Sequence, residues 1–134
     1  MSATIAGRAE ELLRAKNFCN VATLRADGTV HGVPVWVDLQ DGRPVVNSAE
    51  GRSWPANLRK AGKATVTAMA DNNPYEWVSV TADLVTATHE GADEHIDSLA
   101  KKYLDADSYP FRQPGEQRIK FVLEPERVYY NAPR

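Results

Sequence analysis

The sequence predicts a mainly β (α+β) fold in which six antiparallel strands form a small barrel with helices packed outside it. Two turns, Asp27-Gly28 and Asp41-Gly42, separate runs rich in β-branched residues, which is typical of hairpins. The strand-like runs follow one another without the spacing of parallel βαβ units, so an antiparallel order is expected. The 134 residues fit a single domain spanning residues 1–134.

The composition is that of a balanced globular chain, and it excludes several classes of function. The 16 basic and 18 acidic residues give a net charge of −2, which does not suit a nucleic-acid-binding face. No apolar stretch approaches the ~20 residues that a membrane-spanning helix needs, so no membrane association is expected. The first segment is charged and Cys19 is the one cysteine, so we expect no export signal, no internal disulfide and a cytoplasmic location.

The first half of the chain predicts one helix followed by three strands. Apolar residues recur at helical spacing over residues 4–16, which indicates an amphipathic helix. Pro34 has no N–H to donate and Gly32 has no side chain to pack, so we expect a bulge or a sheet edge at these residues. The three strands are predicted over residues 18–25, 29–39 and 44–49.

The second half predicts two more helices and three more strands. A short helix is expected over residues 53–61, with Ser53 placed to cap its start and Gly62 to end it. A stripe of apolar residues over 92–104 predicts a second, amphipathic helix. The strands are predicted over residues 63–70, 75–88 and 117–124, and the second of these is long enough to serve two neighbours.

The sequence lacks the familiar catalytic signatures, such as GxSxG, a Walker loop, GxGxxG and HExxH. His31, His89 and His95 are expected on a strand, at a strand end and on a helix surface, so no metal site is predicted. Asp97 and Lys101 are expected to pair on the exposed face of the last helix. We therefore assign no catalytic residue.

One segment, residues 47–53 (NSAEGRS), has the features of an anion site. It is expected to run from a strand end into a helix N-terminus, where backbone N–H groups and Arg52 would face a phosphate. The alternative is that Ser53 caps the helix, Gly51 turns the chain and Arg52 is a solvated charge. The residues alone favour this alternative.

Several aromatic side chains lie in or beside polar, turn-rich stretches, outside the apolar stripes. Such residues could meet a planar ligand, form a subunit interface or take part in ordinary packing, and the sequence leaves all three open. They are Trp36, Trp54, Tyr75 and Trp77.

Short motifs follow one another along nearly the whole chain: residues 21–28 (VATLRADG), 33–36 (VPVW), 51–52 (GR) with 57–60 (NLRK), 73–75 (NPY), 100–104 (AKKYL), 109–111 (YPF) with 114–118 (PGEQR), and 124–128 (EPERV). Their order and spacing resemble the pyridoxamine 5′-phosphate oxidase-like split β-barrel superfamily, and more narrowly its probable coenzyme F420-dependent oxidoreductases. The resemblance implies a six-stranded split barrel of the FMN-binding type. It also implies a homodimer with two cofactor sites at the subunit interface.

The resemblance implies coenzyme F420, a deazaflavin, as the cofactor, with FMN as the alternative. The implied reaction passes a hydride from the reduced deazaflavin to an unsaturated organic small molecule. The implied cofactor-binding residues lie at the ring (Pro34, Val35, Trp36, Asn47, Ser48), at the phosphate corner (Arg52, Ser53, Asn57) and on a strand that the partner subunit offers (Tyr75, Trp77).

The chain departs from the family pattern at Trp54 and Ala56, near positions where members often carry a lysine and an arginine. A non-catalytic F420-binding or carrier protein is therefore a further alternative to the oxidoreductase. The loop over residues 105–116 is expected to cover the acceptor. There Arg112 or Arg118 would either meet an acidic substrate or remain a solvated surface charge.

Overall fold

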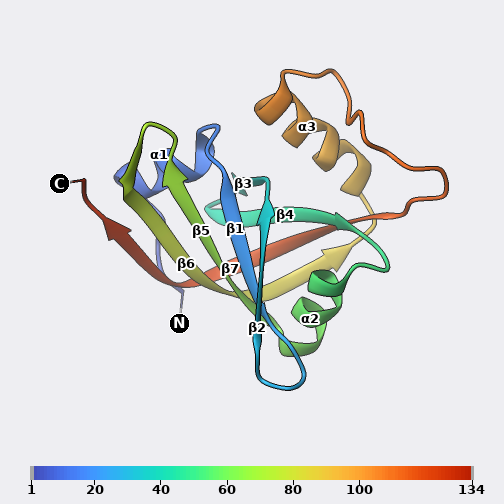
Figure 1. Ribbon diagram of the computed structural model, residues 1–134, viewed down its shortest axis with the longest axis horizontal. Helices are drawn as coiled ribbons and strands as arrows, with labels where there is room; N and C mark the ends of the chain where they lie inside the picture. Colours follow the sequence, from blue (N-terminus) through green and yellow to red (C-terminus); the bar gives the residue numbers. More distant parts are fainter. Residues whose placement is uncertain (1, 134) are drawn as a thin grey trace.

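The computed structural model describes residues 2–133 and contains three helices and seven strands in that range. Their order is α1 (Gly7–Arg14), β1 (Cys19–Leu24), β2 (Val30–Val35), β3 (Val37–Gln40), β4 (Arg43–Ala49), α2 (Ser53–Ala61), β5 (Lys63–Ala70), β6 (Asn73–Thr88), α3 (Ala92–Leu104) and β7 (Arg118–Asn131). Figure 1 shows α1 and α3 at opposite ends of the sheet, with α2 on the same side as α3.

The strands form one antiparallel sheet in the order β2-β1-β5-β6-β7-β4-β3. The predicted count of six is wrong because the run 29–39 forms two strands. Residues up to Val35 pair with β1, and residues from Val37 pair with β4, so the chain changes partner at Trp36. The edge expected near Pro34 is confirmed, since β2 is one edge of the sheet. The other edge is β3, and no ladder joins the two edges, so the predicted barrel closure is not confirmed.

The longest ladder joins β6 to β7 and changes register twice, between Thr81 and Ala82 and between Leu84 and Thr86. The prediction that β6 serves two neighbours is confirmed, because it also pairs with β5. The last strand was predicted to end at residue 124, but it continues to Asn131. Pro125 lies next to the first register shift, where a residue without an N–H is tolerated, and β6 supplies a partner beyond it.

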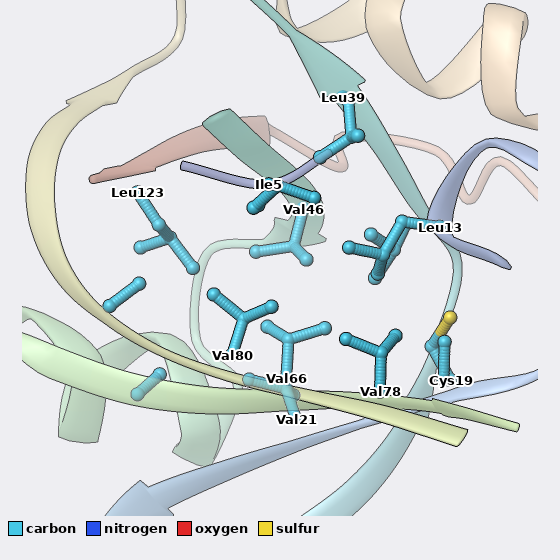
Figure 2. Packing of buried hydrophobic residues seen from close by; sticks show 14 of the residues in the cluster. Ile5, Leu13, Cys19, Val21, Leu39, Val46, Val66, Val78, Val80 and Leu123 are labelled. Atoms are coloured by element: carbon cyan, nitrogen blue, oxygen red, sulfur yellow. The ribbon is translucent and has the colours of Figure 1, made fainter. Parts of the chain in front are cut away.

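The core lies on the concave side of the sheet, where Val78, Val80 and Ala82 of β6 are fully buried. Leu12 and Leu13 of α1 reach the same cluster, and Figure 2 shows Leu13 pointing toward Val78 and Cys19. Helix α1 begins at Gly7 and not at residue 4, although Ile5 is also buried. No helix in the described part of the chain is long and apolar enough to cross a membrane.

Helices α2 and α3 occupy the predicted ranges, with two local differences. Gly62 ends α2 at a left-handed φ of 76°, as predicted, but no side chain caps its start, so the predicted Ser53 cap is wrong. In α3 the apolar stripe is buried as predicted, but Lys101 pairs with Asp105 and not with Asp97, because Asp97 bonds to the following loop. His95 is 4% exposed, so its predicted place on the helix surface is also wrong.

Candidate functional site

A pocket of about 300 Å³ lies between β2, β4, the start of α2, α3 and the loop over residues 105–117. The structure brings five of the ten predicted cofactor residues to this pocket: Pro34, Val35, Trp36, Asn47 and Arg52. Eight further residues that the sequence did not assign to the cofactor complete its lining: Phe18, Val33, Trp54, Ile96, Leu99, Tyr109, Phe111 and Arg118. Most of the wall is therefore apolar or aromatic, as in sites that bind planar small molecules.

Trp36 forms a fixed, flat part of the pocket wall. Its ring stacks on Tyr103 at a centroid distance of 5.4 Å and an interplanar angle of 8°, and Tyr109 meets it edge-on at 6.0 Å. Tyr103 is held in turn, because its hydroxyl donates to the backbone oxygen of Asn17 at 2.8 Å. Trp36 thus stands where the chain passes from β2 to β3, and the rings of Tyr103 and Tyr109 hold its ring in place.

Asn47 connects three elements at the polar end of the pocket. Its Nδ2 donates to the backbone oxygen of Ala92 at 2.9 Å and lies 3.0 Å from His95 Nδ1. Its Oδ1 accepts a bond from Arg118 Nε at 3.0 Å. The bonds to Ala92 and Arg118 fix the orientation of the Asn47 amide. We therefore infer that His95 Nδ1 accepts a hydrogen bond from Asn47 Nδ2 and that the proton of the neutral ring is on Nε2.

His95 is neutral at physiological pH. Burial lowers its pKa to about 4, and the nearby charges of Lys120 and Arg118 act in the same direction. Its Nε2 has no hydrogen-bond partner among the described residues. The sequence pattern predicts that His95 lies in the helix over residues 92–104. Its burial, however, results from the packing of α3 on β4 and β7.

Arg118 is a buried cation whose charge is already compensated. Its side chain is 2% exposed and forms an ion pair with Glu116. Its guanidinium also lies 4.9 Å from the centre of the Tyr109 ring. This arrangement fixes the start of β7 against the loop, and it leaves Arg118 with a structural role at the pocket wall.

Arg52 is different, because its side chain is exposed at the pocket rim and forms no hydrogen bond or ion pair within residues 2–133. Its neighbour in the same region, Arg59, is occupied by both carboxylate oxygens of Glu50 at 2.7 and 2.8 Å. Arg52 immediately precedes the first residue of α2, so the positive end of that helix adds to its charge. The rim therefore offers a cation to an anionic group.

The other five predicted residues lie outside the pocket of this chain. Ser48 is fully buried, and its Oγ has no partner among the described residues. Asn57 donates to Thr23 Oγ1 at 3.3 Å, and Ser53 is the exposed first residue of α2. Tyr75 is 64% exposed, and Trp77 packs on Tyr129 with centroids 5.3 Å apart. Their roles toward a cofactor stay predictions.

Some of the missed pocket residues had a signal in the sequence. Tyr109 and Phe111 belong to a motif that the resemblance includes, but their position beside Trp36 depends on the fold of the loop. Phe18 precedes β1 and is 74% exposed at the rim. Within residues 2–133 no group of three or more His, Cys, Asp or Glu side chains could hold a metal ion.

The family model of pyridoxamine 5′-phosphate oxidase matches residues 5–132, so the chain belongs to that family. The family includes oxidoreductases, and its fold binds flavin-type cofactors. No curated protein matches the chain.

Among solved structures the chain is similar to an F420 reductase, with a TM-score of 0.78 and 19% identity, covering 90% of this chain and 94% of that one. It is also similar to HupZ from Group A Streptococcus, with a TM-score of 0.69, 16% identity and coverage of 96% and 98%. A third similar structure is a putative pyridoxamine 5′-phosphate oxidase from Listeria innocua, with a TM-score of 0.63 and 14% identity. The match covers 85% of this chain and 87% of that one. At these identities the similarities show the fold.

Proposed function

We propose that the chain binds coenzyme F420 in this pocket and uses its reduced form to reduce an unsaturated organic molecule. The observation that carries the proposal is the junction of a largely apolar pocket with a cation at its rim, Arg52, whose side chain forms no hydrogen bond or ion pair within residues 2–133. A deazaflavin has the matching parts, a planar ring and an acidic tail. The membership of the chain in a family whose fold binds flavin-type cofactors supports the same conclusion.

The pocket of one chain is smaller than the whole cofactor. A volume of about 300 Å³ is near the lower end of the ~300–1,000 Å³ typical of small-molecule sites. The ring would lie along Pro34, Val35 and Trp36, and the tail would leave the pocket past Arg52. The polar groups of Asn47 all point to protein partners, so this residue supports the pocket wall.

The charge at the rim favours F420 over FMN. The phosphodiester of F420 carries one negative charge, whereas a phosphate monoester carries about −1.5 to −2 at neutral pH. Trp54 is buried against Phe121 with ring centroids 5.5 Å apart, and Ala56 adds no charge, so neither position supplies a second cation. At the phosphate group itself, one arginine and one helix N-terminus match the single charge of the diester better.

When bound, the reduced cofactor would supply a hydride, and a proton from solvent would complete the reduction of the acceptor double bond. The chain supplies placement. Trp36 would lie against the bound ring, and Arg52 would hold the acidic tail. Ile96 and Leu99 exclude water from the reacting face, which keeps the two reactants in contact.

Direct binding tests the proposal. We expect the purified protein to bind F420 in the micromolar range, followed by the fluorescence of the deazaflavin. Arg52→Gln removes the unpaired cation and should weaken binding about tenfold, the usual scale for one charge-assisted contact. Arg127→Gln makes the same charge change on an exposed part of β7 and should leave the affinity unchanged. Failure to bind F420, or a yellow protein that retains FMN, would refute the F420 assignment.

A further inference from the structure

Two arginines belong to the chain segment that follows α3, Arg112 in the loop over residues 105–117 and Arg118 at the start of β7, and both form ion pairs with carboxylates. Arg112 bonds to Asp93 Oδ1 at 2.7 Å through Nη1 and to Asp97 Oδ1 at 3.0 Å through Nη2. Asp93 and Asp97 belong to α3, so Arg112 is directed away from a ligand and onto the helix. It offers no free positive charge to an acidic molecule.

The second arginine, Arg118, lines the pocket but is compensated by Glu116. The side chains of the pair are 2% and 6% exposed. Burial opposes the ionisation of Glu116 most strongly. The bonds from Arg118 and from the backbone N–H of Gln113, together with the charges of Arg118 and Arg52, outweigh it, so the pKa of Glu116 lies below its usual range. Glu116 is therefore charged at neutral pH, and a ligand carboxylate near Arg118 would have to compete with it.

The remaining pocket surface formed by α3 and this loop is apolar. Ile96 and Leu99 are buried in the α3 wall, and Phe111, which is 57% exposed, also lines the pocket. Phe18 adds a second exposed aromatic ring to the same rim. A carboxylate placed here would lose its hydration without gaining a partner, which is costly, whereas a neutral conjugated molecule would bury these surfaces favourably.

We propose that Glu116 makes this pocket select neutral, planar, unsaturated acceptors over acidic ones, because it cancels the charge of Arg118. This inference rests on the proposed function and names the substrate class of the same site. Glu116 is a specificity-determining residue in this scheme and takes no part in the transfer itself. The acceptor gains a hydride from the cofactor and a proton from solvent at its double bond, as above.

The test compares two ligands with one planar skeleton, methyl cinnamate and cinnamate, by calorimetric titration of the cofactor-free protein. Every chain in the series carries Arg52→Gln, so that the rim cation does not attract the anion. We expect the ester to bind about tenfold more tightly than the carboxylate. Glu116→Gln should shift this ratio about tenfold toward the carboxylate, whereas Glu126→Gln, an exposed change of the same charge, should not.

Three results would overturn the proposal: equal or tighter binding of the carboxylate by the parent chain, a ratio unaffected by Glu116→Gln, or no binding of either ligand at millimolar concentration. If Glu116→Gln does not fold, the double variant Glu116→Gln/Arg118→Gln removes both charges and should keep the ester preference of the parent. A weaker affinity for the carboxylate in the double variant would show that Arg118 attracts anions in the parent. Because no cofactor is present, these results are independent of whether F420 binds.

Discussion

At the scale of single residues, the pocket depends on buried polar groups whose protonation is fixed by their neighbours. His95 is the clearest case, since it lies between Asn47 and the charges of Arg118 and Lys120. A proton on this ring would be buried, would lose the bond from Asn47 and would face two cations. The neutral ring is therefore part of what keeps α3 on the sheet.

The stability of the protein should fall as His95 is forced to ionise. The unfolded chain takes up this proton near the usual pKa of about 6.5, and the folded chain takes it up only near pH 4. Between these two pH values the unfolded state thus binds more protons than the folded state. The contribution of neutral His95 to the free energy of unfolding is therefore complete above about pH 6.5 and is lost as the pH falls toward 4. We expect a loss of about 1–2 kcal/mol between pH 7 and pH 5 in urea unfolding.

His95→Gln should remove this part of the pH dependence, because glutamine does not titrate. Ser98→Ala, on the same helix, keeps the histidine and should keep the slope. An unchanged slope in His95→Gln would show that another group causes it.

At the scale of elements, α3 and the loop after it act as one unit because Asp97 ties them together. Its Oδ1 accepts the backbone N–H of Tyr109 at 2.8 Å and Arg112 Nη2 at 3.0 Å. Tyr109 then meets Trp36 edge-on, so the position of the loop defines one wall of the pocket. Figure 1 shows this loop as a long arch from α3 to the start of β7, with no other strand or helix in it.

Asp97→Ala should loosen the loop without unfolding the sheet. The amide of Tyr109 loses its acceptor, so we expect backbone amides within residues 107–112 to exchange hydrogen about tenfold faster, as in a local opening made easier by about 1.4 kcal/mol. Hydrogen exchange read by mass spectrometry or NMR measures this. Glu94→Ala changes an exposed acid on the same helix and serves as the control. Equal exchange in both variants would contradict the role given to Asp97.

At the scale of the whole molecule, a second group of aromatic residues lies outside the pocket, where the start of β6 pairs with the end of β7. Tyr75 and Tyr129 are 64% and 59% exposed, and Trp77 packs on Tyr129. In the homodimer that the family resemblance implies, Tyr75 and Trp77 of one subunit would complete the cofactor site of the other. The small volume of the pocket in one chain agrees with a site that a second chain extends.

Mixed dimers test this arrangement. Trp77→Ala should weaken F420 binding about tenfold although Trp77 lies outside the pocket of its own chain, because a buried aromatic contact is lost. Arg52→Gln should do the same from within the pocket. Subunits of the two variants, mixed and re-formed, should regain native affinity at about one site in each mixed dimer, where both native residues meet. Sedimentation as a single chain, or full binding by Trp77→Ala, would contradict the shared site.

Much of the fold was predictable because its signals are local. The β5 range and the helix ranges 53–61 and 92–104 agree with the structure, since turn residues and apolar periodicity act over a few neighbours. Five of the pocket residues were predicted, and they lie in two segments that the sequence singled out, residues 33–36 and 47–53, on or next to β2, β4 and α2. The errors arose where a distant strand decides: β7 continues past Pro125 because β6 pairs with it, and Trp36 divides a run that looked continuous.

The class of fold, most of its elements and the cation before α2 could be predicted from the sequence, because each of these follows from residues adjacent in the chain. Which charges remain free depends on the tertiary structure. Arg112 and Arg118 look like Arg52 in the sequence, yet carboxylates brought by α3 and the loop compensate the first two, while Arg52 has no partner within residues 2–133. Compensation of a charge depends on which groups come within a few ångströms of it in space. Contacts between residues far apart in the chain cannot be predicted from neighbouring residues alone.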